Sequence, residues 1–412
     1  MGNGKVSVAA AIFCAIGAAA IHAVPSVYPT GTTIYDPAKA WSGYTVFVLP
    51  QTGAVLIDMN GKTVRQWATF EGASGGPMRI LPGGFAMGAL GSGRPHQEST
   101  SLGLFDWKDA PLSTFDKTRQ HHDWQRDDFP AGYYSPEATP KADGARTLIL
   151  SHKNLTNSAI NEKTLEDDYI YEVDAAGRVI WEWMANQHVD EMGFSPAART
   201  AMKASAALGP RQAIDWLHVN SMTYVGPNRL FDAGDQRFRP DNVLISSREA
   251  SFMAIIGRDG RIVWRMGPDY RDSAELKAIG QIIGQHHAHI IPKGLPGAGN
   301  LLVFDNGGAS GYGEPTAAAP EGQSVVSRGN SRVLEIDPVT LKKVWDYSIA
   351  GTESFRFFSH YVSSAQRLAN GNTLITEGAD GRLFEVTPAG AIVWAAAARV
   401  VPWCRSVSTR SA

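Results

Sequence analysis

Stretches of alternating apolar and polar residues recur along the chain, and each closes on a tryptophan or another large aromatic residue. Alternation with a period of two predicts a β-strand, because successive side chains of a strand point to opposite faces. Sequences such as Asp-x-x-Gly and Pro-x-Gly supply the positive φ that a tight turn between two strands needs. Each stretch is therefore predicted to form a β-hairpin. The six copies span Tyr44–Trp67, Leu102–Phe115, Tyr169–Trp183, Ser251–Trp264, Arg332–Trp345 and Arg382–Trp394.

A further short apolar segment precedes four of these hairpins, at residues 146–153, 241–249, 299–307 and 371–378. Four short strands per unit, repeated radially, are typical of a β-propeller. The six copies therefore predict an all-β, six-bladed propeller that forms a single domain over residues 24–394. A pair of packed sheets is the alternative, but it gives no reason for the recurrent closing tryptophan.

Two segments interrupt the strand pattern, at residues 184–216 and 273–283. In the first, Ser195 stands directly before Pro196, and in the second, Ser273 precedes a run with helical spacing. A serine at this position caps the first turn of a helix. We expect both segments to form short helical insertions between blades on one face of the disc, where such insertions build the mouth of a site.

The two ends of the chain differ from the repeats. Lys5 is the only lysine, arginine, aspartate or glutamate in the first 35 residues, so residues 1–23 are predicted to be a signal peptide cleaved after Ala23. The alternative is an uncleaved anchor, since about 18 apolar residues just span a bilayer. Residues 395–412 are predicted to be an atypical, truncated or disordered tail. Ala395–Ala398 favours helix over strand, so we expect the tail not to complete the first blade.

The signal peptide predicts a periplasmic or secreted protein with no stable membrane insertion after cleavage. Cleavage would remove Cys14 and leave Cys404, so the mature chain cannot form an internal disulfide. Hydrophobic residues make up 43% of the chain and the formal net charge is -2. This composition is that of a globular protein without the basic field that a nucleic acid partner requires.

Four groups of histidines share one repeat position, shortly before an inner strand of a blade. They are His121 with His122, His218, His286 with His287 and His289, and His360. The innermost strands of a propeller line its central channel, so we expect these groups to converge there. A lone histidine is more often a half-buried structural residue, and we leave His96, His152 and His188 with that interpretation.

Clustered histidines suit either a metal ion or acid–base and nucleophilic chemistry on an anion. Because alternate residues of a strand face opposite sides, His287 and His289 are expected to share a face that His286 does not. The second chemistry needs cations that neutralise the oxygens of the anion. Candidates are Arg328, Arg332 and Arg367. We expect no metal and no cofactor.

Several of these segments resemble the bacterial arylsulfotransferases, which use no nucleotide sulfate donor. The resemblance covers about Val27 to Trp394, and Asp215–Met222 and Ile283–His289 are its more specific motifs. Further matching segments are Tyr28–Tyr35, Ile57–Lys62, Leu302–Gly307 and Ser363–Asn372. The resemblance implies an exported propeller that moves a sulfuryl group from a small aryl sulfate to a phenol through a sulfohistidine. Better-known members also carry a disulfide, which this chain cannot form.

The resemblance also implies roles for individual residues. The family order is two histidines, an arginine and then the nucleophilic histidine. It maps onto His218, then His287 or His286, then an arginine, then His360 as the nucleophile. Residues 308–313, where the arginine is expected, contain none, so Arg332 is the nearest substitute. As substrate-binding residues we expect His122, Asn220 and Asn306.

Two other classes of protein fit part of the pattern. A quinoprotein propeller that binds pyrroloquinoline quinone also docks tryptophans, but it usually has eight blades and an adjacent cysteine pair. A non-catalytic propeller that serves as a binding scaffold, or an inactive family member, is the alternative function. Six units and a single mature cysteine argue against the quinoprotein. A binding scaffold predicts neither converging histidines nor helical insertions at the mouth of a site.

Overall fold

The computed structural model describes residues 28–49, 52–70, 76–91, 98–127, 129, 131, 133, 135–137, 144–205, 213–312 and 323–398. The predicted signal peptide lies outside these residues, as does the tail from residue 399 onward. No helix within the described ranges is long and apolar enough to cross a membrane.

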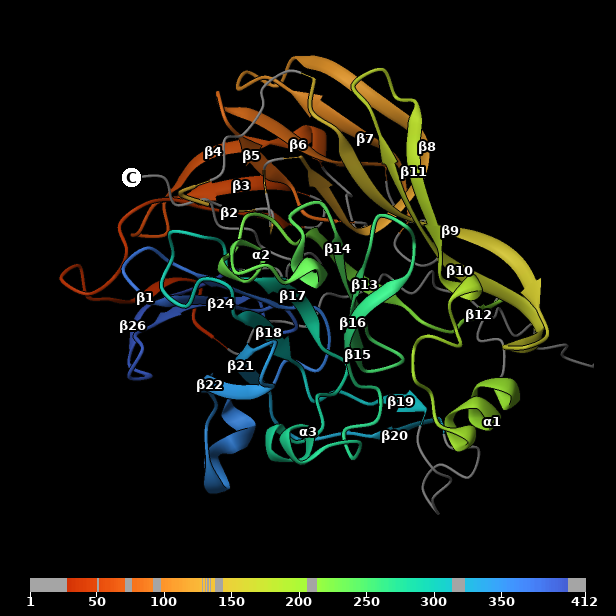
Figure 1. Ribbon diagram of the computed structural model, residues 1–412. Helices are drawn as coiled ribbons and strands as arrows, with labels where there is room; N and C mark the ends of the chain where they lie inside the picture. Colours follow the sequence, from red (N-terminus) through yellow and green to blue (C-terminus); the bar gives the residue numbers. More distant parts are fainter. Residues whose placement is uncertain are drawn as a thin grey trace, which may run out of the picture.

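Antiparallel sheets, arranged around a common centre, make up most of the molecule (Figure 1). One sheet holds β2 (Thr45–Leu49), β3 (Gly53–Ile57) and β4 (Thr63–Trp67). A second holds β13 (Val219–Tyr224), β14 (Val243–Ser247), β15 (Phe252–Ile256) and β16 (Ile262–Met266). A third holds β17 (His286–Ile290), β18 (Leu301–Asp305), β21 (Arg332–Asp337) and β22 (Lys342–Tyr347). The arrangement is therefore all-β and propeller-like, with few helices.

The largest sheet is eight-stranded and joins two sequence repeats. Its strands are β5 (Arg79–Leu81), β6 (Phe85–Leu90), β7 (Ser99–Phe105), β8 (Pro111–Arg126), β9 (Thr147–Asn157), β10 (Asn161–Val173), β11 (Val179–Met184) and β12 (Ile214–Asp215). Strand β8 pairs with β7 through Pro111–Gln120 and with β9 through Gln120–Arg126. Only four of the described sheets have four or more strands, so the predicted count of six blades is not confirmed.

The last sheet contains both ends of the described chain. Its order is β1 (Gly31–Tyr35), β26 (Ile392–Ala397), β25 (Arg382–Val386), β24 (Thr373–Glu377) and β23 (Ser364–Arg367). Strand β1 pairs with β26, beside which it lies in Figure 1. The N-terminal strand β1 therefore lies on the outer edge of the last sheet. Pairing on both sides makes Ala395–Ala397 a strand despite its helix propensity.

The closing aromatic residues connect successive repeats. The indole Nε1–H groups of Trp183, Trp264, Trp345 and Trp394 donate to the carbonyls of Gly260, Pro338, Pro388 and Met59 at 3.0, 2.8, 2.8 and 2.8 Å. Each acceptor lies in the hairpin turn of another repeat, and Met59 belongs to the first. Trp67 packs edge-to-face on Trp107 at 5.3 Å between ring centroids. The recurrent tryptophan therefore fastens one hairpin to the next around the ring.

The predicted helices are confirmed at both insertions. Helix α1 (Pro196–Ala204) begins after Ser195, and α3 (Ala274–Ile279) begins after Ser273, each serine accepting a backbone N–H of the first turn. Short α2 (Arg229–Asp232) and the 3₁₀ turns η1 (Ala68–Phe70), η4 (Ala185–Gln187), η6 (Gln236–Phe238) and η7 (Gly351–Arg356) complete the helical part. Helix α1 contacts β19 (Ser310–Tyr312), which pairs with β20 (Gln323–Val326). In Figure 1, α1, this hairpin and α3 lie together in the lower part of the view.

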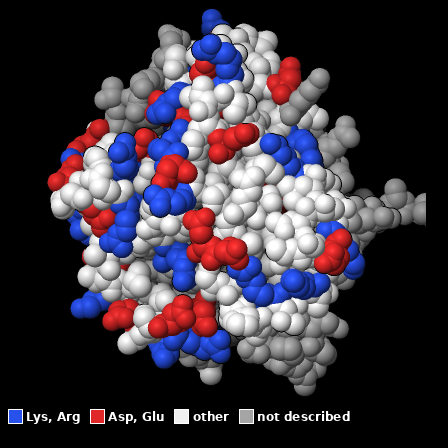
Figure 2. Space-filling view, turned by 45° about the vertical axis from the view of Figure 1, so that its right-hand side comes forward, with Lys and Arg blue, Asp and Glu red and all other residues white. Residues whose placement is uncertain are grey.

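Charged side chains are mixed on the face drawn in Figure 2. Acidic and basic groups alternate there, and no large area of one sign is visible on this face. This distribution agrees with the small net charge of the whole sequence, -2.

Candidate active site

Three of the predicted histidines share one unusual backbone conformation. His122, His218 and His287 have φ angles of 52°, 50° and 54°, in the left-handed region that few non-glycine residues adopt. His122 and His287 stand where the register of an inner strand shifts, in β8 and in β17, and His218 directly precedes β13. Such a bulge re-aims a side chain and is common beside active sites. The shared repeat position in the sequence therefore corresponds to a shared structural device.

His218 forms a close pair with Asp215. Its Nδ1 lies 2.5 Å from Asp215 Oδ2, and the two side chains are 21% and 18% exposed. Asp215 is positioned by β12, which pairs in parallel with β10. A carboxylate accepts the Nδ1–H, so it fixes the tautomer in which Nε2 carries the lone pair. His218 is thus a partly exposed imidazole with a reactive nitrogen set by its partner.

His122 lies directly beside His218. The ring centroids are 4.7 Å apart at an angle of 74°, and His122 Nδ1 lies 2.8 Å from Nδ1 of His121. Strand β8 contributes His122, whereas His218 directly precedes β13 of the next sheet. The convergence of histidines from two repeats, predicted from their register, is seen for this pair.

The three histidines of β17 separate as expected from strand alternation. The rings of His287 and His289 are 4.7 Å apart, while His286 Nδ1 lies 2.8 Å from Asn306 Oδ1. His287 Nδ1 lies 2.9 Å from the Ala365 carbonyl of β23. His289 Nε2 lies 2.5 Å from the hydroxyl of Tyr133. The prediction that His287 and His289 share a face is confirmed, and contacts of β17 reach the innermost strand of the last sheet.

The two predicted asparagines connect inner elements of the fold. Asn220 Nδ2 donates to the Gln285 carbonyl at 2.7 Å, which ties β13 to the start of β17. Asn306 Nδ2 donates to the carbonyls of Ser359 and Val362, both at 2.7 Å. Asn306 therefore holds the loop that carries His360. Their predicted contact with substrate stays a prediction.

His360 lies in an exposed loop between η7 and β23. Its ring is 4.4 Å from that of Tyr361 and 6.0 Å from that of Phe358. Burial lowers the pKa of His360, Asp380 opposes the shift and the charge of Arg248 adds to it. Within the described residues no hydrogen bond to the imidazole of His360 is found, in contrast to His218.

The arginines proposed from the sequence are held by protein groups. Arg332 donates from Nε and Nη2 to Asp305 at 2.9 and 2.7 Å, and from Nη1 and Nη2 to the carbonyls of Ile279 and Gln281 at 3.0 and 3.1 Å. Arg328 also pairs with Asp305, at 2.8 Å. Arg367 pairs with buried Glu335 at 2.6 Å. These bonds anchor the segments around β17 and β18, and a sulfate-binding role for Arg332 stays a prediction.

Arg248 was not singled out by sequence reasoning. It follows β14, its backbone N–H donates to the His218 carbonyl at 2.9 Å, and its Nη2 donates to the Ala309 carbonyl at 3.3 Å. Its Nη1 pairs with Glu249, and the side chain is 25% exposed. Arg248 therefore reaches the glycine-rich segment where the family pattern expects an arginine. No motif marks it, because the folding of two distant segments brings it there.

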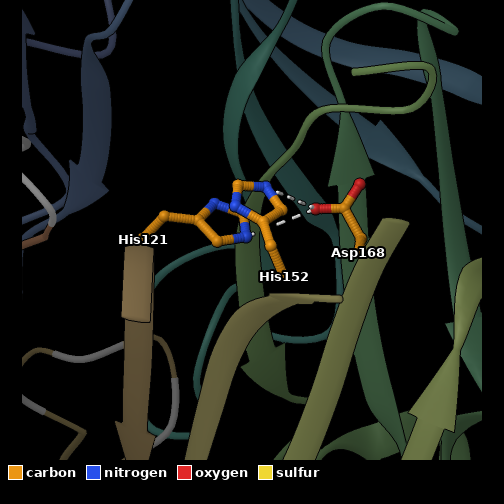
Figure 3. A group of neighbouring side chains, drawn as sticks. All are labelled: His121, His152 and Asp168. Carbon is orange, nitrogen blue, oxygen red and sulfur yellow. Dashed lines mark ion pairs between the residues drawn. The ribbon is translucent and has the colours of Figure 1, made fainter. Parts of the chain in front are cut away.

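A buried group of polar side chains adjoins His122. It consists of His121, His152 and Asp168 (Figure 3). A second group shares His152 with Glu98 and Glu166. The imidazoles of His121 and His152 are stacked at 3.5 Å between centroids. Sequence reasoning gave His152 a structural role and did not consider Asp168. Only the pairing of β8, β9 and β10 brings the three residues together.

The fold and this site define a propeller-like protein with a histidine centre suited to an anionic group. The Arylsulfotransferase (ASST) family model matches residues 122–394, which is more than half of the chain. The chain therefore belongs to the arylsulfotransferase family. Membership supports sulfuryl transfer from aryl sulfates in general, with small aryl sulfates and phenols as the substrates that the family implies.

Comparison with other proteins adds no closer assignment. No curated protein matches the sequence significantly. A protein of unknown function from Bacteroides caccae is similar at a TM-score of 0.45 and 10% identity, over 90% of this chain and 100% of that one. A functionally unknown protein from Desulfotomaculum acetoxidans DSM 771 gives 0.41 and 11%, over 93% and 89%. Apo AztD from Citrobacter koseri gives 0.37 and 7%, over 89% and 99%. Likeness at this level carries no argument about function.

Proposed function

We propose that this protein is an aryl-sulfate sulfotransferase that works through a sulfohistidine and needs no nucleotide donor. The observation that carries the proposal is the close pair of His218 and Asp215 beside a second histidine, His122. Family membership gives the general reaction, and the pair provides a nucleophile of the required kind. A non-catalytic scaffold has no use for a partly exposed imidazole held in one tautomer.

The geometry favours His218 as the nucleophile. With Nδ1–H bonded to Asp215, the Nε2 lone pair is available, and the side chain is 21% exposed. His360, the nucleophile expected from the order of the family residues, has no such partner among the described residues. His360 therefore remains the second candidate, and the experiment below separates the two.

The reaction consists of two displacements at sulfur. Nε2 of His218 attacks the sulfur, the N–S bond forms, and the bond from sulfur to the aryl oxygen breaks with its electron pair leaving on the phenolate. In the second displacement the oxygen of the acceptor phenol attacks sulfur as its proton passes to a base or to water. The N–S bond then breaks and its electron pair returns to Nε2. Asp215 offsets the positive charge of the sulfonated imidazole.

An arginine and hydrogen-bond-donating histidines around His218 would stabilise the sulfuryl oxygens. Arg248 is tied by its backbone to His218 and reaches Ala309, and its guanidinium is partly exposed. His122 and His287 occupy the same bulge position in neighbouring inner strands. We assign anion binding to Arg248, His122 and His287, because Arg332 is already bonded to Asp305 and two carbonyls.

We also infer that the molecule is a six-unit propeller. Dividing the largest sheet at Gln120, which pairs with both β7 and β9, yields two units of four strands each. The aromatic contacts between hairpins support the same count, since they join successive repeats. Export to the periplasm or the medium is proposed from residues 1–23.

The nucleophile can be tested with 4-nitrophenyl sulfate as donor and phenol as acceptor. We expect nitrophenol release by the wild type to depend on phenol with ping-pong kinetics, and His218→Ala to lower kcat on the order of 10⁴-fold or more. His188→Ala is the matched control, because His188 pairs with Glu191 and stacks on Trp183 of the edge strand β11. Mass spectrometry of the donor-treated enzyme should locate one sulfuryl group on the peptide carrying His218.

Two results would change the proposal in different ways. An active His218→Ala enzyme together with an inactive His360→Ala enzyme would move the nucleophile to His360 and keep the reaction. A folded wild type that releases no phenol from any aryl sulfate would overturn the reaction itself.

A further inference from the structure

Three adjacent strands place two imidazoles and a carboxylate in one buried group. His121 comes from β8, His152 from β9 and Asp168 from β10, and His152 is the cross-strand partner of Asp168. The residues are 0%, 3% and 0% exposed. Figure 3 shows the carboxylate of Asp168 pointing at both rings. Side chains of this kind, buried together, need either mutual pairing or a bound ion.

The distances are close to those of a metal site. Asp168 Oδ1 lies 3.4 Å from His121 Nε2 and 3.8 Å from His152 Nε2. In a tetrahedral zinc site, metal–ligand distances of about 2.0–2.1 Å place the ligand atoms about 3.3 Å apart. Small movements of the stacked rings would bring both Nε2 atoms and the carboxylate oxygen onto one ion.

Neighbouring groups hold the remaining atoms of the same side chains. His152 Nδ1 lies 3.1 Å from Glu98 Oε1, which leaves Nε2 toward Asp168. Asp168 Oδ2 accepts the Val219 N–H at 3.0 Å. A carboxylate behind a ligating histidine and a hydrogen bond on a ligating carboxylate are typical outer contacts of metal sites. Arg119 in turn pairs with Glu98, at 2.6 Å.

The local charge also favours a cation. Strand β10 contributes consecutive acidic residues, Glu166, Asp167 and Asp168, all at most 4% exposed. Asp168 Oδ1 accepts no hydrogen bond within the described residues. A neutral imidazole is the form that binds metals, and a dication would compensate the buried carboxylates.

We propose that His121, His152 and Asp168 bind one divalent zinc ion. Two nitrogens and one carboxylate oxygen suit Zn²⁺ better than Mg²⁺ or Ca²⁺, which prefer oxygen ligands. The sequence alone had led to the expectation of no metal. On binding, His121 Nε2 exchanges its contact with the Ser151 carbonyl, at 3.1 Å, for the ion.

The ion would set the hydrogen bond between His121 and His122. With Nε2 on the metal, His121 must carry its proton on Nδ1 and donate it to His122 Nδ1, 2.8 Å away. His122 then bears its own proton on Nε2, as a donor toward a sulfuryl oxygen beside His218. This last consequence rests on the proposed function, whereas zinc binding itself does not.

Metal is first removed from the full-length protein with a chelator, and the protein is then titrated with Zn²⁺ and with Co²⁺. The bound metal per chain is measured by elemental mass spectrometry. We expect one equivalent per chain, visible d–d absorption of the Co²⁺ form, and a melting temperature that rises with Zn²⁺ but not with Mg²⁺. The His152→Ala and Asp168→Asn variants should no longer bind one metal ion per chain. His188→Ala, which removes a histidine paired with Glu191, should keep it.

The wild type decides the proposal even where a buried variant fails to fold. Absence of saturable binding and of a Zn²⁺-dependent rise in melting temperature would overturn it. If His188→Ala and His152→Ala lost bound metal to the same extent, the proposal would also be overturned, because the metal would then not be bound by His121, His152 and Asp168. Zinc binding by an enzyme that transfers no sulfuryl group would leave this inference standing and remove only the proposed function.

Discussion

The arginines around the histidine centre differ in how many protein acceptors already surround them. Arg332 is bonded to buried Asp305 and to two carbonyls, so its charge serves the fold. Arg248 keeps a quarter of its side chain exposed and contacts the His218 backbone. Whether an arginine can bind a substrate anion therefore depends on how many protein acceptors already bond to its guanidinium, more than on its position in the sequence.

This contrast predicts opposite effects of two alanine substitutions. Arg248→Ala should lower kcat/KM on the order of 10²–10³-fold, as loss of one anion-stabilising donor does, with little change in melting temperature. Arg332→Ala should instead lower the free energy of unfolding by about 3 kcal/mol, because it removes a partner of buried Asp305. Kinetics with 4-nitrophenyl sulfate and urea unfolding of both variants provide the measurement. The reverse pattern would return the anion-binding role to Arg332.

Glu377 makes the stability of the protein depend on pH. Burial raises the pKa of Glu377 from 4.5 to about 7, with Arg382 opposing the shift. Because the folded-state pKa lies above the unfolded one, the stabilising contribution of the protonated carboxyl is complete below about pH 4.5 and is lost as the pH rises toward about 7.

The prediction concerns the pH dependence of unfolding. Between about pH 5 and about pH 8, the wild type should lose up to about 3 kcal/mol relative to Glu377→Gln, which does not titrate. Urea unfolding of both proteins at the two pH values tests this. Glu162→Gln, at an exposed position, should follow the wild type. A constant difference between Glu377→Gln and wild type would show that Glu377 is already ionised at the lower pH.

At the scale of elements, the loop carrying His360 packs tightly on the segment after β18. A side-chain carbon at Gly308 would overlap the His360 carbonyl, whereas one at Gly329 would meet nothing within 4 Å. Gly308 therefore allows a close approach of two backbones. The approach fixes His360 and brings Ala309, the acceptor of Arg248, to the same place.

Gly308→Ala should therefore displace this loop. We expect a loss of about 1–3 kcal/mol in the free energy of unfolding, as for other overpacking substitutions, together with a reduced kcat/KM. Gly329→Ala is the matched control and should leave both quantities unchanged. Thermal unfolding and steady-state kinetics measure the two effects. A fully active and stable Gly308→Ala protein would mean that the loop does not depend on this contact.

The elements differ in how far the sequence predicts them. The hairpins and both serine-capped helices follow from alternation and capping, which are local. The continuous course of β8 does not, because the polar run around Arg119–Asp123 resembles a loop and is a strand only through its partners β7 and β9. Likewise, β1 gains its strand structure from β26, which lies at the other end of the chain.

The same distinction applies to the candidate site. The repeat position of the histidines is visible in the sequence, and Asp215 stands only three residues before His218, so their pairing was open to local reasoning. Arg248 and Asp168 are different, because their partners lie in segments whose alignment depends on the pairing of whole strands. The sequence therefore predicts which histidines take part more readily than which charges surround them.

For the whole molecule, stability depends on closing the ring. Trp394 in the last sheet is buried and donates to the Met59 carbonyl in the first repeat, next to the pairing of β1 with β26. This contact joins the two ends of the described chain without a covalent bond.

Trp394→Phe should weaken the closure. The change removes an indole hydrogen bond and part of a buried ring, so we expect a loss of about 2–3 kcal/mol in the free energy of unfolding. Trp345→Phe removes an equivalent but solvent-exposed bond to Pro388, and a smaller loss is expected. Urea unfolding followed by circular dichroism gives both values. Equal losses would indicate that the closing contact is no more important than any other contact between hairpins.

The contacts between hairpins also explain how repeats of one chain can differ so much from one another. In four of these contacts the tryptophan bonds to a main-chain oxygen, and the residues that supply this oxygen are Met59, Gly260, Pro338 and Pro388. A main-chain oxygen is present whatever the side chain, so the turn residues can be substituted while the indole keeps its hydrogen-bond acceptor. Substitutions can therefore accumulate in the turn of each contact, while the tryptophan must be retained. We expect the spacing of the tryptophans to preserve the signal of internal duplication better than the turn sequences do.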